Sequence, residues 1–260
     1  MQGLAETGTW VDNGGVPSVR WNRYWGRSYD WSADGDEWSG QAAYSGQPYE
    51  EWKAALVDAF LRPEIEPSAT VLEIGPGHGR WSAELAALAG RLHLVDLNPE
   101  CVAFCRERFA AEEKVVCHQG DGSSLPAELA GAIDFAWSYD CCVHMELDTL
   151  EAYLSGLASA LRPGGRAVLH HPGRRHRWLG LGFLRHLGPL RTIYQWLSMG
   201  RDTAGGGDGD RGNVSGEAVR AAATRAGLRV VAQVDRWGPD GAYDCRRFRD
   251  LITTLERPSA

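Results

Sequence analysis

The spacing of apolar and polar residues becomes regular from about residue 52, where two patterns begin to alternate. Short apolar runs rich in β-branched residues, such as ATVLEIG, are typical of buried strands. Stretches with apolar residues three and four positions apart are typical of amphipathic helices. The predicted strands comprise residues 69–75, 91–97, 115–122, 132–140, 166–171 and 228–237. The predicted helices comprise residues 51–61, 81–90, 99–109, 147–161 and 215–227.

Alternating strands and helices favour right-handed crossovers and a mostly parallel sheet with helices on both faces. The chain is therefore predicted to be a doubly wound α/β protein, with one domain over residues 53–260. The last apolar segment, YDCRRFRDLITTLE (243–256), is predicted to close the sheet as a strand or a strand followed by a helix.

Two segments interrupt the regular pattern. Residues 1–52 hold six of the eleven tryptophans without a clear helical or strand period. They form either an aromatic arm packed on the core or a lid over a ligand. Residues 172–213 follow the fifth strand as an irregular insertion, a candidate substrate cap, and end in the loop TAGGGDGDRGN.

Composition excludes several classes of protein. The formal net charge of −7 argues against a general nucleic-acid or membrane-surface binder. No run of about 18 apolar residues predicts a membrane span, and the N-terminus lacks the pattern of a signal peptide. The six cysteines are scattered rather than arranged as a disulfide framework, which favours the reducing cytoplasm.

A glycine-rich turn joins the first strand to the next helix in VLEIGPGHGRW. Gly75, Gly77 and Gly79 allow a tight turn and bring main-chain N–H groups close to a ligand at the helix N-terminus. Both NAD-binding proteins and methyltransferases use such turns. The GxGxG spacing after Glu73, and Asp96 at the end of the second strand, favour the second class.

Five ordered segments then resemble the successive motifs of class I S-adenosylmethionine-dependent methyltransferases. They are LEIGPGHGRW, LVDLN, GDGSSL, the WSYD strand and LRPGGRAVL, and the resemblance covers residues 69–172 closely and 215–251 more loosely. It implies a Rossmann-like sheet of seven strands whose last strand is antiparallel. The YDCRRF segment is predicted to be that strand. The implied cofactor is S-adenosylmethionine, and the implied product is S-adenosylhomocysteine.

The resemblance also implies roles on the methionine and ribose side of the cofactor. Glu73 would lie near the methionine amino group, and Gly75 with Gly77 would line the methionine and ribose. Asp96 would bind the ribose diol.

On the adenine side, the resemblance implies that Leu97 lies against the ring. Asp121 with Gly122 would contact the adenine edge, and Tyr139 would contact the cofactor through its backbone. The alternative for the aspartates is ordinary capping of turns.

The stretch WSYDCCVHME holds the candidate chemistry. His144 is the predicted general base, because an imidazole accepts protons near neutral pH and this residue lies just beyond the fourth strand. Asp140 or Glu146 could orient the ring or hold a substrate hydroxyl. The alternative is that His144 caps the next helix or pairs structurally with one of these acids.

His170 and His171 end the fifth strand and are candidate substrate ligands or a second base. Successive strand residues point to opposite faces, so one of the two is expected to face the pocket. The alternative is a hydrogen-bonded histidine at a strand end.

No metal is predicted, because the dense carboxylate set that hard cations prefer is not evident. The alternative is a divalent ion bound by Asp140, His144, His170 or His171, and Asp244. The adjacent Cys141 and Cys142 lack CxxC spacing, and we interpret them as packing residues.

Residues 152–201 contain eight arginines and no Asp, Glu or Lys. The arginines could bind an anionic substrate. Alternatively, they pair with the acidic, tryptophan-rich arm of residues 1–52 or serve solubility.

Taken with the resemblance to bacterial small-molecule methyltransferases of natural-product biosynthesis, the sequence predicts O-methylation of a sugar or polyketide-type hydroxyl. The acceptor could be anionic or glycosylated, and a homo-oligomer is compatible with the sequence. The alternatives are N-methylation of an amino sugar or other small amine, a non-catalytic cofactor-binding module, and a nicotinamide-dependent oxidoreductase.

Overall fold

The computed structural model describes residues 48–173, 212–246 and 249–259. The aromatic arm predicted at residues 1–52 lies outside the described residues except for its last five positions. Most of the insertion predicted at residues 172–213 also lies outside them. The roles proposed for these two segments therefore stay predictions.

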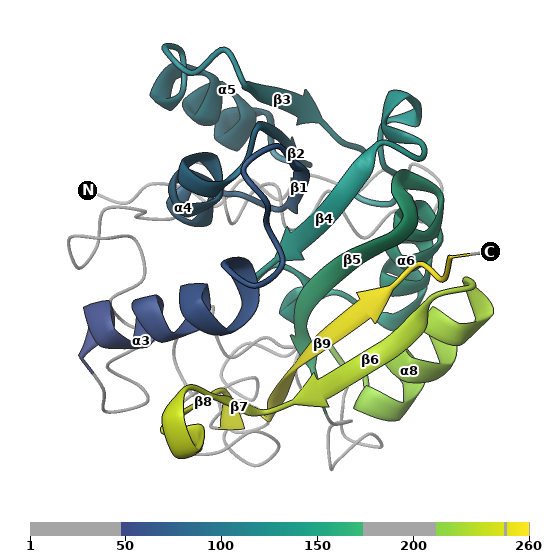
Figure 1. Ribbon diagram of the computed structural model, residues 1–260. Coiled ribbons are helices and arrows are strands. Elements are labelled where there is room, and N and C mark those ends of the chain that lie inside the picture. The colour runs from purple at the N-terminus through teal and green to yellow at the C-terminus, as the bar shows by residue number, and fades with distance from the viewer. Residues whose placement is uncertain (1–47, 174–211, 247–248, 260) are drawn as a thin grey trace, which may run out of the picture.

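A seven-stranded sheet forms the centre of the molecule, with strand order β3-β2-β1-β4-β5-β9-β6 (Figure 1). Its strands are β1 (Thr70–Ile74), β2 (Arg91–Asp96), β3 (Val115–Gln119), β4 (Ile133–Ser138), β5 (Leu161–Pro172), β6 (Arg229–Val234) and β9 (Asp250–Glu256). The first five strands are parallel, and β9 runs antiparallel to both of its neighbours, β5 and β6. The predicted doubly wound, mostly parallel sheet is confirmed.

One strand assignment from the sequence is wrong. In the YDCRRF segment, Tyr243–Asp244 form β8, which pairs with β7 (Arg236–Trp237) in a separate two-stranded ribbon. The antiparallel strand of the main sheet is β9, which follows this segment. A strand with neighbours on both sides needs buried side chains along its length. DLITTLE meets this requirement, whereas Arg246 of YDCRRF is exposed.

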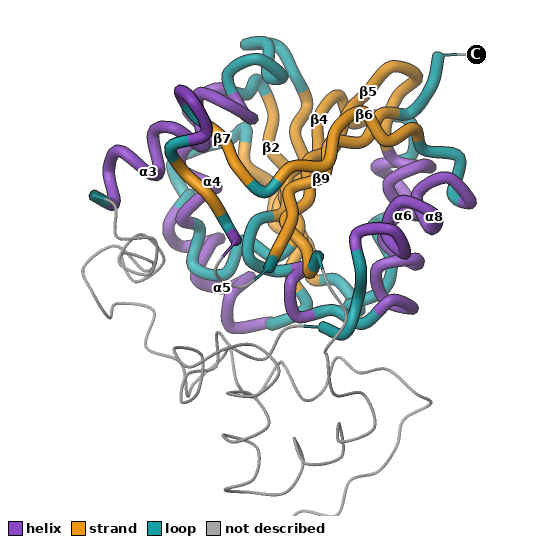
Figure 2. Tube along the Cα trace, turned by 90° about the horizontal axis from the view of Figure 1, so that it is seen from below, coloured by secondary structure: helices purple, strands orange, loops and turns teal. Residues whose placement is uncertain are grey.

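Helices cover both faces of the sheet (Figure 2). The helices α3 (Tyr49–Leu56), α4 (Arg80–Leu88) and α5 (Pro99–Arg108) lie on one face, and α6 (Leu147–Ala160) and α8 (Gly216–Arg225) lie on the other. The predicted cap of α5 is confirmed, because the Asn98 side chain accepts from Glu100 N at 2.9 Å and Pro99 starts the helix.

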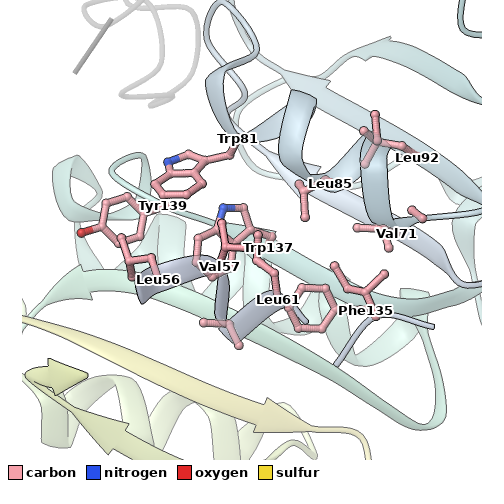
Figure 3. Packing of buried hydrophobic residues seen from close by; sticks show 14 of the residues in the cluster. Leu56, Val57, Leu61, Val71, Trp81, Leu85, Leu92, Phe135, Trp137 and Tyr139 are labelled. Atoms are coloured by element: carbon pink, nitrogen blue, oxygen red, sulfur yellow. The ribbon is translucent and has the colours of Figure 1, made fainter. Parts of the chain in front are cut away.

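The core on the α3–α5 side is rich in aromatic rings (Figure 3). Trp52 of α3 packs edge-on against Tyr139 and Trp237, with ring centroids 5.9 and 6.1 Å apart. Trp81 of α4 packs against Trp137 at 5.6 Å. Rings of this size bury large apolar areas and resist displacement. These aromatic side chains therefore form a packed layer of the core next to the carboxyl ends of β1 and β4.

No helix within the described ranges is long and apolar enough to cross a membrane.

Candidate cofactor and active site

The glycine turn after β1 has a backbone that suits glycine. Gly75, Gly77 and Gly79 have φ values of +71°, +56° and +84°. A β-carbon on Gly75 would lie 2.2 Å from Cys141 Sγ, and one on Gly79 would lie 2.8 Å from Phe109 Cε2. The absence of side chains lets the backbone of this turn pack closely against Cys141 and Phe109, and the N–H groups of the three glycines donate to Val95 O, Asp96 Oδ2 and Pro76 O.

Glu73, on β1, is a buried acid directly before this turn. Ser82 Oγ of α4 donates a hydrogen bond to Glu73 Oε2. Burial raises the pKa of Glu73 to about 8, although Ser82 and the nearby Arg80 guanidinium oppose this rise. Burial disfavours the charged carboxylate of Glu73. A cation beside it, such as an ammonium group, would stabilise that charged form.

Asp96 joins the end of β2 to the glycine turn. Its Oδ2 accepts from Gly77 N at 3.1 Å, and its Oδ1 accepts from Asn98 N at 2.8 Å. Burial raises the pKa of Asp96 to about 6, against the effect of these backbone N–H groups. Each carboxylate oxygen has a further lone pair, so the group could also accept from a diol. Leu97, the next residue, is half-buried.

Asp121 is exposed and caps its own turn. Its Oδ1 accepts from Ser123 N at 2.8 Å and from Ser124 N at 2.7 Å, and its Oδ2 accepts from Ser124 Oγ at 2.7 Å. Mainly through these bonds, the pKa of Asp121 falls to about 2. Gly122 has φ +85°. This is the geometry of a turn cap, and the adenine contact remains a prediction.

The turn after β4 is anchored to its neighbours at several points. Ser138 Oγ donates to Ile74 O at 2.9 Å and receives a bond from Cys142 Sγ at 3.3 Å. The buried Tyr139 ring stacks on Trp137 at 5.7 Å and on His170 at 4.2 Å. Cys141 packs on the glycine turn through Gly75. The predicted cofactor and substrate segments are therefore in contact.

His144 lies in this turn, in the 3-10 segment Cys142–His144, and only 8% of its surface is exposed. Its backbone N–H donates to Cys141 O at 3.2 Å. The N-cap of α6 is Glu146, so His144 does not cap that helix. Glu146 Oε2 instead accepts from Asn213 N at 3.3 Å, where the chain returns from the insertion.

The two histidines of β5 differ in their surroundings. His171 is fully buried, and its Nδ1 donates to Pro172 O at 2.8 Å while its Nε2 meets Thr253 Oγ1 at 2.6 Å. Burial lowers the pKa of His171 to about 4. His170 instead accepts from Asp140 N through Nδ1 at 3.2 Å. The structure thus brings His170, and not His171, to the β4 turn.

Sequence reasoning missed Asp250 and Ser82. Asp250 starts β9, and its Oδ2 lies 3.4 Å from His170 Nε2. The antiparallel pairing of β5 with β9 brings the two residues together, and no local pattern signals it. Ser82 lies on the buried face of α4, where a serine after an acidic motif is a weak signal.

The candidate metal ligands lie within the described residues, and the Arg-rich segment lies only partly within them. Within the described ranges, no group of three or more His, Cys, Asp and Glu could hold a metal. Asp244 lies on β8, in the separate ribbon. Arg162 pairs with Asp134, and Arg166 pairs with Glu64 at 3.0 Å. The other six arginines of the Arg-rich segment lie outside the described residues.

Comparison with known proteins places the central part of the chain. Residues 71–165 match the family model of a methyltransferase domain. The ribosomal RNA small subunit methyltransferase A of Synechococcus sp. is 37% identical over 71 residues, which are 27% of this chain and 26% of that protein. The ubiquinone biosynthesis O-methyltransferase of Xanthomonas axonopodis pv. citri is 30% identical over 112 residues, 42% of this chain and 46% of that protein. The chain thus spans less than half of the length of these curated relatives.

Solved structures share the fold over more of the chain. A geranyl diphosphate C-methyltransferase from Streptomyces coelicolor aligns with a TM-score of 0.63 at 15% identity, covering 93% of this chain and 98% of its own. A putative methyltransferase from Haloferax volcanii, solved with the activator Trm112, aligns with a TM-score of 0.57 at 21% identity, covering 88% and 96%. The sheet order and the domain match agree on one class, whose cofactor is S-adenosylmethionine. The chain has the Rossmann-like fold of class I S-adenosylmethionine-dependent methyltransferases, and its residues 71–165 match the methyltransferase-domain model.

Proposed function

We propose that the protein transfers a methyl group from S-adenosylmethionine to a hydroxyl of a small molecule, a sugar or a polyketide-type intermediate, with His144 as general base. The observation that carries this proposal is the contact between the turn that holds His144 and the glycine turn, through Cys141 and Gly75. Because His144 follows Cys141 by three residues, this contact supports a proton acceptor near the proposed cofactor site.

The cofactor, when bound, supplies an electrophilic methyl group on a sulfonium. The chain must then hold the acceptor hydroxyl in line with that methyl, since proximity and orientation account for much of the rate. As the oxygen–carbon bond forms and the carbon–sulfur bond breaks, the hydroxyl proton passes to His144 and later to water. A base in this role typically contributes about 10²- to 10⁴-fold.

For the cofactor, we propose that Glu73 faces the methionine ammonium and that Asp96 faces the ribose diol. Their raised pKa values support this, because each buried acid is better stabilised with a cation or donor beside it. We propose that Gly75 and Gly77 line the methionine and ribose. Leu97, Asp121, Gly122 and the Tyr139 backbone stay proposed adenine contacts.

On the substrate side, we keep Asp140 as a proposed hydroxyl ligand. We do not propose His171 as a substrate ligand, because both of its ring nitrogens already have hydrogen-bond partners within the fold. The carboxylate of Asp140 lies in the same buried turn as His144, which supports a shared acceptor site.

Two observations favour a small acceptor and O-methylation. One relative is an O-methyltransferase by name and matches 112 residues at 30% identity, whereas the matches to ribosomal RNA methyltransferases cover 66 to 89 residues at up to 37% identity. The net charge of −7 also disfavours a polyanionic RNA substrate. All six cysteines are free thiols, which supports the proposed cytoplasmic location.

A labelled-methyl screen tests the proposal. The full chain is incubated with S-adenosylmethionine carrying a deuterated methyl and with panels of sugars, aromatic polyketide-type phenols and amino sugars, and products are read by mass spectrometry. The proposal predicts label on oxygen. Label on nitrogen alone would instead support the amine alternative.

The base assignment is tested with His144→Ala against His118→Ala, a histidine of β3 outside the site. Loss of about 10²- to 10⁴-fold in kcat is expected for the first variant and little change for the second. An unchanged kcat in His144→Ala contradicts the base role.

Calorimetry separates the other classes. Heat of binding with S-adenosylhomocysteine and none with NADH is expected. Binding of S-adenosylhomocysteine with no labelled product from any panel would favour a non-catalytic module, and binding of NADH alone would favour an oxidoreductase.

A further inference from the structure

We propose that Asp250 and His170 form a positioning pair that holds the β4 turn, residues 139–144, in the conformation that presents His144 to the acceptor. This inference rests on the proposed function of His144. Neither residue is assigned a catalytic role here, and His170 changes from a predicted substrate ligand to a positioning residue.

The hydrogen bonds of His170 select one tautomer. Asp140 N–H donates to His170 Nδ1 at 3.2 Å, so Nδ1 carries no proton. The ring proton of the neutral imidazole is then on Nε2, which faces Asp250 Oδ2 at 3.4 Å. A negative carboxylate at this position favours the proton on Nε2. Asp250 therefore stabilises the tautomer that can accept from the turn.

The turn needs such an acceptor because of its backbone. Asp140 has φ +63°, in the left-handed region that aspartate tolerates better than most residues but less readily than glycine. Backbones of this kind persist where neighbouring groups hold them. The His170 ring supplies both a hydrogen bond to Asp140 and a stacking surface for Tyr139, with ring centroids 4.2 Å apart.

The path from this pair to His144 is short. Cys141 follows Asp140, and its carbonyl accepts from His144 N at 3.2 Å. A change in the Asp140 backbone would therefore move the 3-10 segment that holds the imidazole. Misplacement of a reacting group by about 1 Å can lower the rate by roughly 10²-fold.

The contacts that His170 and Asp250 already make argue against direct contact of the pair with a substrate. The exposed fractions of His170 and Asp250 are 2% and 1%. His170 could bind a hydroxyl through Nδ1 only by giving up the Asp140 N–H. A positioning role, in contrast, keeps both the Asp140 N–H bond to Nδ1 and the approach of Asp250 Oδ2 to Nε2.

Histidine NMR of the full chain, labelled with ¹⁵N and saturated with S-adenosylhomocysteine, tests the tautomer directly. The wild-type protein is expected to show His170 with Nδ1 unprotonated and Nε2 protonated. A proton on Nδ1 would overturn the proposal.

Four variants test the coupling to His144. His170→Leu removes the acceptor, and His170→Asn keeps an amide oxygen near the position of Nδ1. Asp250→Asn removes the charge without changing the shape. His171→Leu is the matched control, since it removes an equally buried histidine from the next position of the same strand.

The ring resonances of His144 are expected to shift in His170→Leu and Asp250→Asn, and to stay near their wild-type positions in His170→Asn and His171→Leu. Binding of S-adenosylhomocysteine verifies that each variant is folded. If His170→Leu does not fold, Asp250→Asn against His171→Leu decides the question. Equal His144 resonances in all folded variants would overturn the positioning role.

With an acceptor from the labelled-methyl screen, His170→Leu should lower kcat by about 10²-fold with little change in KM, and His170→Asn should restore most of it. If no acceptor hydroxyl is methylated, the proposed function fails. The tautomer and the His144 resonances still decide the positioning role in that case.

Discussion

Cys141 lies directly against Gly75, so that a β-carbon on Gly75 would come within 2.2 Å of the Cys141 sulfur. The contact joins the glycine turn after β1 to the turn after β4. It is also the point at which the proposed cofactor and acceptor sites meet.

This contact predicts strong coupling between the two positions. Gly75→Ala should destabilise the protein through both the clash and the left-handed backbone at φ +71°, and it should abolish binding of S-adenosylhomocysteine. Adding Cys141→Gly removes the clash but not the backbone strain. Urea unfolding of the single and double variants should give a coupling energy of about 1–3 kcal/mol. Additive effects would show that Cys141 does not limit the space at Gly75.

The raised pKa of Glu73 predicts that stability falls as pH rises from 4.5 to about 8. Its folded pKa of about 8 lies above the value of 4.5 in the unfolded chain. Its contribution to stability is therefore fully present below pH 4.5 and is lost as pH rises through 8. Glu73→Gln mimics the protonated acid at every pH, so it should match the wild type near pH 5 and exceed it near pH 9.

Urea unfolding at pH 5, 7 and 9 measures this difference. Asp96→Asn is the control, because the pKa of Asp96, about 6, confines its effect to lower pH. A wild-type stability that does not fall relative to Glu73→Gln between pH 7 and 9 would show that Glu73 is not held protonated by burial.

Asp96 and Asp121 are predicted to differ in their effect on cofactor binding. Asp96→Ala removes the acceptor of two backbone N–H groups and a proposed ribose contact, so affinity for S-adenosylhomocysteine should fall about 10- to 100-fold. Asp121→Ala tests the adenine contact: a comparable fall supports it, whereas an unchanged affinity would limit Asp121 to capping its turn. Calorimetry at one pH and salt concentration makes the comparison.

The lowered pKa of His93, which lies beside His118, predicts a loss of stability in acid. His93 Nδ1 lies 2.9 Å from His118 Nε2, and burial lowers the pKa of His93 to about 4, with the neighbouring His118 adding to the effect. For a histidine with a lowered folded pKa, stability is present above the unfolded value of 6.5 and is lost as pH falls through 4.

His93→Gln should therefore flatten the decrease in stability between pH 6.5 and 4, measured by thermal unfolding. His171 titrates in the same range, so a parallel His171→Gln separates its share. An identical decrease in His93→Gln and the wild type would contradict the prediction.

The local pattern of apolar and polar residues was enough to predict most of the strands and helices. ATVLEIG and RLHLVDL formed β1 and β2, and Asn98–Pro99 started α5, because burial periodicity and capping depend on neighbours in sequence. The order of the motifs was also enough to place Glu73 and Asp96 at one edge of the sheet, since parallel strands end together. The same reasoning failed for YDCRRF, where a two-residue strand in a separate ribbon replaced the predicted strand.

The sequence by itself determined the parallel sheet, the glycine turn and the acids at the edge of the sheet. The periods of strands and helices can be recognised from consecutive residues. Only the tertiary structure decided which histidine of β5 meets the β4 turn and that Asp250 faces it. That choice depends on the pairing of β5 with β9, in which residues far apart in the chain become neighbours. Side-chain tautomers and shared buried contacts arise from such long-range pairing, which no local pattern encodes.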